Sequence, residues 1–378
     1  MKLENLFVGR VHIGIVSIIF IIALSYGLLF YLHNITEQEV KKSLFDQQVQ
    51  RQMEATKSIS EHISSDLSLV MNMLDGLANS IYLQKGDLSG DGAKKIIEEK
   101  YNQFNDIVNR LFILDKDDVV TVILAPKRSD ISVGADFSFR DWVKETRSSE
   151  RPVFSDGFER MGIYRIFITY PIMNRTSGEY IGLLGTSIPT VQFFAHYGNV
   201  GNINSQFLAA YNKNATLLAN GASQDLVGEN FFGSETQKFI NHNKILNNLT
   251  QNLLAGNSGY AVYDYGKGER LTTGYPIFVN AEPKYFLEIV TPTRQIYAQL
   301  GDVLFIQRIR MFSFLAATTT AAIAVLILLL TKWNVILRKE VKRRTRELEE
   351  SYDEMKEYLD SVLAELKRDA TIKGKYKK

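Results

Sequence analysis

The chain has 378 residues, of which 45% are hydrophobic and 23% are charged, and its formal net charge is +2. This balance provides no general electrostatic attraction to nucleic acids or to acidic substrates. The lack of cysteine excludes disulfide bonds, thiolate catalysis and cysteine-ligated zinc or iron–sulfur clusters.

Two uncharged apolar stretches are long enough to cross a membrane, which requires about twenty residues. The first, IGIVSIIFIIALSYGLLFYL, starts at Ile13, and the second, MFSFLAATTTAAIAVLILLLT, starts at Met311. The first could also be a signal peptide, but it exceeds the usual apolar core of such peptides and lacks a small-residue cleavage site after Leu32. We therefore expect transmembrane helices over 11–32 and 311–331.

The basic residues predict the orientation of the chain in the membrane. The N-terminal segment 1–10 contains two of them, Lys2 and Arg10. A denser group directly follows the second stretch: Lys332, Arg338, Lys339, Lys342, Arg343, Arg344 and Arg346. Because positive charge favours the cytoplasmic side, we expect cytoplasmic termini and an extracytoplasmic segment over 33–310, in a two-span protein of the cell membrane.

A long helical pattern opens the extracytoplasmic segment. Apolar residues recur every three or four positions from Ile59 to Ile81, and no proline interrupts residues 37–83. We expect one helix over 33–85, of which about fifty residues would extend roughly 75 Å from the membrane.

The stretch GDLSGDGAKKIIE follows this helix. Asp87, Asp91 and Glu98 have the spacing of a calcium-binding loop, but Lys94 and Lys95 lie where an apolar residue and an oxygen donor are usual. The alternative is a turn between two helices, with Asp91 as the N-cap of the second. The sequence leaves calcium binding at Asp87–Glu98 open, and we predict no metal site.

Strand patterns dominate from Leu111 onward, and they occur in two passes. The first contains a hairpin at LFILDKDDVVTVIL, a helical stretch at DFSFRDWVKETR, and strands at PVFSDGFE, IYRIFITYPIM and YIGLLGTSI. The second has a hairpin at QFLAAYNKNATLLA, a helix around 235–254, and strands at GYAVYDYG, ERLTTGYPIFV and KYFLEIVTP. Tyr-Pro-Ile occurs once in each pass, at Tyr170 and at Tyr275.

This repetition predicts an α+β chain with two tandem antiparallel-sheet domains. We place the membrane-distal domain at 86–197, the membrane-proximal domain at 198–294, and a helix that leads to the membrane at 295–310. The architecture resembles the double Cache family of extracytoplasmic sensors, in which two PAS-like domains follow a long N-terminal helix between two membrane spans. The resemblance covers most of 37–294 and is supported by FRDW, PVFSD and ITYPIMNRTSGEYIGLLGTSI.

The resemblance implies a ligand site in the membrane-distal domain. Family members that bind amino acids share an R-x-W pattern, then Y-x-D, then an Asp on the last strand. Arg140 and Trp142 match the first element and Asp156 matches the acid of the second, whereas Phe154 replaces the Tyr and Ser187 replaces the last Asp. Arginine and indole N–H groups would hold a carboxylate, but the groups that would neutralise a buried ammonium are missing. We therefore expect a small carboxylate-bearing ligand rather than a standard α-amino acid.

Each of these assignments has a structural alternative. Arg140 could form a salt bridge with Asp136 or Asp141, and Trp142 could be an ordinary core residue. The tyrosines of GYAVYDYG fit a strand with aromatic packing, and we do not favour a second pocket there.

The C-terminal segment 332–378 contains a heptad pattern. Its a and d positions are Val341, Thr345, Leu348, Tyr352, Met355, Leu359, Val362 and Leu366. Four such heptads with charged flanking positions indicate a coiled coil, and we predict a parallel homodimer. The alternative is a single amphipathic helix on anionic lipid, which suits only the basic stretch 338–346.

Catalytic motifs are lacking in the sequence. The five histidines are scattered without metal-ligand spacing, and none lies in 332–378, where a histidine kinase would need a phospho-acceptor. We predict a receptor without enzymatic activity or cofactor, which transmits a conformational signal through its second span to an unknown cytoplasmic partner. The alternatives are the sensory part of a longer histidine kinase or chemoreceptor, and a structural surface protein without a ligand.

Overall fold

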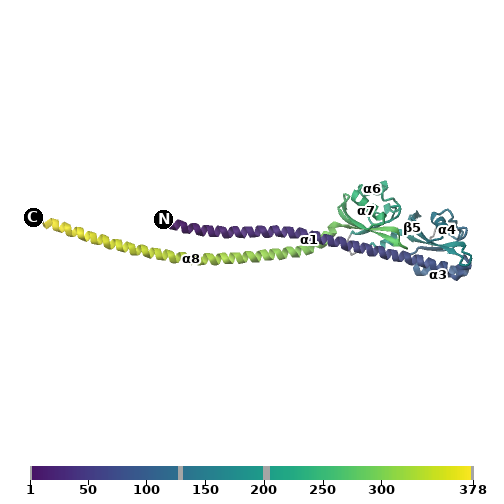
Figure 1. The fold of residues 1–378 in the computed structure, drawn as a ribbon, viewed down its shortest axis with the longest axis horizontal. Coiled ribbons are helices and arrows are strands. Elements are labelled where there is room, and N and C mark those ends of the chain that lie inside the picture. The colour runs from purple at the N-terminus through teal and green to yellow at the C-terminus, as the bar shows by residue number, and fades with distance from the viewer. Residues whose placement is uncertain (1, 127–130, 199–204, 376–378) are drawn as a thin grey trace. The chain divides into compact units, whose positions relative to one another are not determined.

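The computed structural model describes residues 2–126, 131–198 and 205–375. It divides into two compact units, Met1–Asp302 and Val303–Lys378. The first unit contains two antiparallel sheets and a long N-terminal helix, which confirms the mixed α and β class and the two predicted sheets (Figure 1).

The N-terminal helix, α1 (Lys2–Ala78), includes the first predicted membrane span and continues without a break into the helix that we expected outside the membrane. It ends before residue 85, and a short helix, α2 (Ile81–Gln84), follows. The next helix, α3 (Asp91–Phe104), has Gly90 as its N-cap, so the prediction that Asp91 caps it is wrong. The carboxylate of Asp87 instead accepts a hydrogen bond from the Gly90 backbone N–H, at 2.7 Å.

The distal sheet has the strand order β2-β1-β6-β5-β3, with β4 also paired to β5. Its strands are β1 (Arg110–Asp115), β2 (Val120–Leu124), β3 (Val153–Phe154), β4 (Phe158–Arg160), β5 (Ile163–Met173) and β6 (Tyr180–Pro189). The hairpin expected around 111–124 is present as the β1–β2 pair. The helical stretch after it forms α4 (Asp141–Ser149), and α5 (Thr190–Ala195) follows β6.

The proximal sheet repeats this topology in the order β8-β7-β11-β10-β9. Its strands are β7 (Phe207–Asn212), β8 (Leu217–Asn220), β9 (Gly259–Asp264), β10 (Glu269–Val279) and β11 (Glu282–Pro292). A 3-10 turn, η1 (Gln224–Leu226), follows β8. The single helix expected around 235–254 is divided into α6 (Ser234–Phe239) and α7 (Lys244–Leu254), because Asn241 and His242 adopt positive φ angles of 52° and 50°.

The two Tyr-Pro-Ile segments occupy equivalent strands, as the repetition predicts. Tyr170 lies on β5 opposite Leu184 of β6, and Tyr275 lies on β10 opposite Leu287 of β11. In both pairs the register shifts directly after the isoleucine. The hydroxyl of Tyr170 donates to Asp75 of α1 at 2.6 Å.

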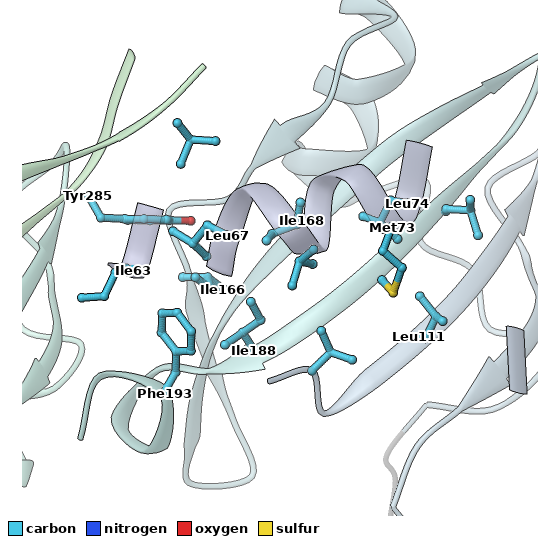
Figure 2. Packing of buried hydrophobic residues seen from close by; sticks show 14 of the residues in the cluster. Ile63, Leu67, Met73, Leu74, Leu111, Ile166, Ile168, Ile188, Phe193 and Tyr285 are labelled. Atoms are coloured by element: carbon cyan, nitrogen blue, oxygen red, sulfur yellow. The ribbon is translucent and has the colours of Figure 1, made fainter. Parts of the chain in front are cut away.

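One apolar core joins α1 to a face of each sheet. It includes Ile63, Leu67 and Leu74 of α1, which are fully buried. Figure 2 shows these side chains beside Ile166 and Ile168 of β5. Because residues of the proximal sheet belong to the same cluster, the two domains share a continuous packed layer along the helix.

The last helix, α8 (Thr293–Lys375), starts directly after β11 in the first unit and forms the second unit. Within Arg308–Leu366 it contains a segment that is long and apolar enough to cross a membrane, and none of its most apolar stretch is buried in the protein. Among the described residues this is the one such segment, so the two-span topology and the first span stay predictions.

Candidate functional site

The distal sheet has a second apolar face, opposite the one that packs on α1. Alternate residues of a strand point to opposite faces, so Leu111 and Ile113 of β1 face α1 while Phe112 faces away. Helix α4 covers this outer face with Trp142 and Val143, both of which are buried against it.

A small cavity lies between the sheet and this cover. The residues that line it come from β1, β4, β5, α4 and the segment before α4: Arg110, Ile131, Phe137, Arg140, Trp142, Phe158, Arg160, Arg165 and Phe167. Its volume is about 10 Å³, which suffices for about one water molecule. Four of the described lining residues are arginines, and none of the described ones is acidic.

Arg140 and Trp142, two of the predicted site residues, meet at this cavity. Arg140 is the N-cap of α4, and its guanidinium carbon lies 4.5 Å from the ring centroid of Phe158. The Trp142 ring stacks on Phe167, with centroids 4.8 Å apart and planes inclined by 9°. The indole is 6% exposed, and its N–H is buried without a hydrogen-bond partner among the described residues. An unsatisfied buried donor is unfavourable, and a ligand oxygen in the cavity would remove that cost.

Trp142 is also the core residue of the alternative interpretation. It forms edge contacts with Phe137 and packs near Phe112 in the outer core cluster. The indole therefore contributes apolar packing and, in addition, a buried N–H donor. The two acids that the sequence offered as partners for Arg140 both have other contacts. Asp141 Oδ1 lies 4.0 Å from Lys144 Nζ, and Asp136 Oδ1 accepts a hydrogen bond from the Ser138 backbone N–H at 2.8 Å.

Arg110 and Arg165 are cavity residues that the sequence interpretation missed. Both are buried in strands, and the Arg165 guanidinium donates to the backbone oxygens of Arg160 at 3.1 Å and Ile163 at 3.2 Å. The available signal was an arginine within an apolar strand pattern, as in RLFIL and IYRIFI. A buried charged side chain needs polar or charged partners, and such a group often marks a functional site.

Ser187 lies on β6 directly between Arg110 of β1 and Phe167 of β5. Directly opposed residues in an antiparallel sheet point to the same face, so the serine side chain lies on the cavity side. Its hydroxyl is fully buried and has no hydrogen-bond partner among the described residues.

Phe154 and Asp156, the other two predicted residues, do not line the cavity. Phe154 packs against the core on the α1 side. The carboxylate of Asp156 accepts a hydrogen bond from the Asn214 side chain at 2.7 Å, and its backbone oxygen accepts one from Asn212 at 2.8 Å. The hydroxyl of Tyr285 donates to the neighbouring Ser155 oxygen at 3.1 Å. The β3–β4 loop therefore connects the distal domain to the proximal one.

No group of three or more His, Asp or Glu side chains among the described residues is arranged to hold a metal ion. The described stretch Asp87–Glu98, the possible calcium loop, contains no such group either. It forms the loop before α3 and the first two turns of that helix.

The comparisons with known proteins identify a sensor domain. Residues 69–188 match the model of the HK/GC/Chemotaxis protein-like sensor domain family. This segment contains the end of α1 and nearly all of the distal domain with its cavity. No curated protein matches the sequence.

Several solved structures share the fold of the extracytoplasmic part. The ligand-binding domain of the Pseudomonas aeruginosa amino acid chemoreceptor PctB, in complex with L-arginine, is 14% identical with a TM-score of 0.50, over 66% of this chain and 90% of that one. That of the Pseudomonas fluorescens chemoreceptor CtaA, in complex with L-isoleucine, is 12% identical with a TM-score of 0.50, over 70% and 99%. An extracellular ligand binding receptor from Desulfohalobium retbaense is 17% identical with a TM-score of 0.50, over 64% of this chain and 40% of that one.

This chain thus spans less than half of the Desulfohalobium receptor. At these identities the likeness concerns the fold. Together with the family match, it confirms the resemblance to extracytoplasmic Cache-type sensor domains.

Proposed function

Because residues 69–188 match the model of the HK/GC/Chemotaxis protein-like sensor domain family, we propose that the chain is a transmembrane receptor for a small carboxylate-bearing molecule. The ligand would occupy the distal cavity between the sheet and α4. Its signal would pass to the cytoplasm, and the chain would not itself be an enzyme.

One observation carries the choice of an anionic ligand. Four arginines and the buried, unpartnered N–H of Trp142 line one cavity, and no Asp or Glu is among its described lining residues. Guanidinium groups bind planar carboxylates through paired, charge-assisted hydrogen bonds. A ligand ammonium would find no carboxylate among the described lining residues, which argues against a zwitterionic α-amino acid. More than one arginine favours a dicarboxylate over a monocarboxylate.

The size of the cavity requires it to open before a ligand can enter. With about 10 Å³ the cavity is closed around its own side chains, so the roof of α4 and the preceding segment would move outward to admit a ligand. Such a closed form and an open, liganded form are the two states that a receptor needs. The same closure also suits the second candidate, a structural surface protein whose distal domain is a rigid spacer.

The β3–β4 loop provides a route from the cavity to the rest of the protein. Phe158 lines the cavity and stacks on Phe167, and the loop before it contacts Asn212, Asn214 and Tyr285 of the proximal domain. The proximal domain continues through β11 directly into α8. A movement of Phe158 on ligand binding would therefore reach α8 through packed elements.

The remaining steps follow from the sequence. We propose two membrane spans, cytoplasmic termini and a parallel homodimer through residues 332–378, which would contact a separate signalling partner or lead into further domains of a kinase or chemoreceptor. The apolar surface of the α8 segment within Arg308–Leu366 supports its placement in a membrane.

A thermal-shift screen of the full chain in detergent tests this proposal. It compares mono-, di- and tricarboxylates, amino acids, amines and purines under the same conditions. We expect carboxylates, and dicarboxylates most, to raise the melting temperature, because a ligand that binds only the folded state stabilises it. If no compound raises the melting temperature, the spacer function is the better account.

A further inference from the structure

The proximal domain encloses a second cavity, on the face of its sheet that lies away from α1. Its volume is about 30 Å³, which accommodates roughly two water-sized groups. Six aromatic residues line it: Phe207, Tyr211, Phe231, Phe239, Tyr263 and Tyr265. The side chain of Glu288, on β11, also lines it.

The carboxylate of Glu288 lies where an aromatic ring, that of Phe112, fills the equivalent space in the distal domain. Both sheets align through their Tyr-Pro-Ile strands, and this alignment places Glu288 of β11 at the position of Gly185 of β6. Gly185 lies opposite Phe112, whose ring fills the space above it, so that a Cβ atom there would lie 2.2 Å from the ring. Glu288 lies opposite Ala209, which leaves that space to the carboxylate and the cavity.

Glu288 is 1% exposed and has only neutral hydrogen-bond donors. The Tyr211 hydroxyl donates to one carboxylate oxygen at 2.7 Å and the Thr250 hydroxyl donates to the other at 2.9 Å. Among the described residues no cation forms an ion pair with it, and burial raises its pKa to about 7. A buried negative charge without a counter-ion is unfavourable, so this position favours a positively charged partner.

Two further groups suit a cation in the cavity. The hydroxyl of Thr236 lines it, is buried, and has no hydrogen-bond partner among the described residues, so it is available as an acceptor. Aromatic ring faces attract cations. Two basic side chains of the protein already lie over rings that line the cavity: Lys267 Nζ is 4.0 Å from the Phe239 centroid, and Arg270 Cζ is 5.1 Å from the Tyr265 centroid. Neither basic residue lines the cavity, where Glu288 supplies the charged group.

We propose that the proximal cavity is a second ligand site, which binds a small protonated amine with Glu288 as its counter-ion. The ammonium would donate hydrogen bonds to the Glu288 carboxylate and to the Thr236 hydroxyl, while one or two carbon atoms contact the rings. The cavity volume limits the ligand to the size of methylammonium or ethylammonium. The two domains would thus recognise opposite charges with the same fold.

Calorimetric titration of the full chain in detergent with methylammonium chloride tests this site, at about pH 8, where Glu288 is mostly ionised. The parent is expected to bind methylammonium but not tetramethylammonium, which is too large. Glu288→Gln, which retains hydrogen-bonding atoms for Tyr211 and Thr250, should weaken binding by about tenfold or more. The exposed control Glu282→Gln, on the same strand, should bind like the parent.

The outcomes separate this site from the distal one. Because methylammonium has no carboxylate group, its binding to the parent does not depend on whether the distal cavity binds a carboxylate. The inference is overturned if the parent does not bind methylammonium, or if Glu288→Gln binds it equally well, since Glu288 would then be a structural acceptor only. If Glu288→Gln does not fold, Ala209→Leu provides the test, because it fills the cavity and keeps the carboxylate. Unchanged methylammonium binding by Ala209→Leu would contradict the site, and lost binding would support it.

Discussion

At the scale of single residues, Trp142 contributes apolar packing and a buried N–H donor, and a substitution can remove the donor while it keeps the packing. Phenylalanine retains an aromatic ring against Phe167 but lacks the indole N–H. We predict that Trp142→Phe folds like the parent and binds the carboxylate ligand about tenfold more weakly, the effect of one lost hydrogen bond to a charged group. Calorimetry measures the affinity and circular dichroism the fold.

The other tryptophan, Trp333, provides a matched control for this variant, because it lies on α8 far along the chain from the cavity. Trp333→Phe should leave the carboxylate affinity unchanged. Equal affinity of Trp142→Phe and the parent would show that the indole N–H does not contact the ligand.

The buried carboxyl of Glu288 predicts a pH dependence of stability. Burial raises its pKa in the folded protein to about 7, whereas an unfolded chain has a value of about 4.3. The folded state therefore holds the proton more tightly, so its stabilising contribution is complete below about pH 4.3 and is lost as the pH rises through about 7. The change amounts to about 4 kcal/mol in the free energy of unfolding.

Thermal unfolding at a series of pH values measures this contribution. The parent should lose stability between about pH 4 and 7, and Glu288→Gln should lose clearly less over the same range. Glu282→Gln is the control, because Glu282 is exposed and paired with Lys284. Parallel pH profiles of the parent and Glu288→Gln would contradict the assignment.

At the scale of elements, the β3–β4 loop joins the two domains through a few polar contacts. Asn214 donates to Asp156 at 2.7 Å. We predict that Asn214→Ala increases backbone amide exchange in residues 155–157, because the loop loses an anchor, while the carboxylate affinity changes little. Hydrogen-exchange mass spectrometry measures the first effect. Lys213→Ala, which removes only an exposed ion pair, should change neither.

Slower or unchanged exchange in 155–157 after Asn214→Ala would exclude this contact as a link between the domains. A large loss of carboxylate affinity in Asn214→Ala would instead support the role of Asp156 in ligand binding that the sequence pattern suggested.

The elements also show what sequence reasoning can and cannot give. The two sheets were predictable, because hairpins, strands and the repeated Tyr-Pro-Ile are local patterns. The apolar spacing of α1 predicted Ile63 and Leu67 as core, but not the buried polar residues Gln52, Thr56 and Ser60. These form hydrogen bonds with the proximal sheet, for example from Ser60 to the Pro276 oxygen at 2.6 Å, through partners more than two hundred residues away.

The candidate site was predictable only where its residues are near each other in sequence. Arg140 and Trp142 belong to one motif on α4, and the structure brings them together. Arg110 and Arg165 reach the same cavity from β1 and β5, which depends on strand order and not on spacing. Asp156 follows the motif but faces the proximal domain, since the β3–β4 loop turns at Gly157, which has a φ of 88°.

At the scale of the whole molecule, the heptad of α8 predicts self-association. Its positions Leu348, Tyr352, Met355 and Leu359 are all exposed in the single chain, with Leu348 at 72%. Exposed apolar a and d positions favour pairing with a second helix. We predict that the full chain in detergent is dimeric and that Leu359→Glu makes it monomeric at the same concentration, as measured by light scattering after size exclusion.

Ser361→Glu adds the same charge outside the a and d positions and should remain dimeric. A parent that is monomeric, or a Leu359→Glu variant that is as dimeric as Ser361→Glu, would be inconsistent with a coiled coil through this segment.

The central claim is that the arginine-lined distal cavity binds a carboxylate through Arg140. Calorimetric titration of the full chain with a dicarboxylate from the screen, parent beside Arg140→Ala, tests it most directly. Because Arg140 supplies a charge-assisted contact, the account predicts saturable binding by the parent and at least about tenfold weaker binding by the variant, with the fold unchanged. Equal affinity of the two proteins would contradict it.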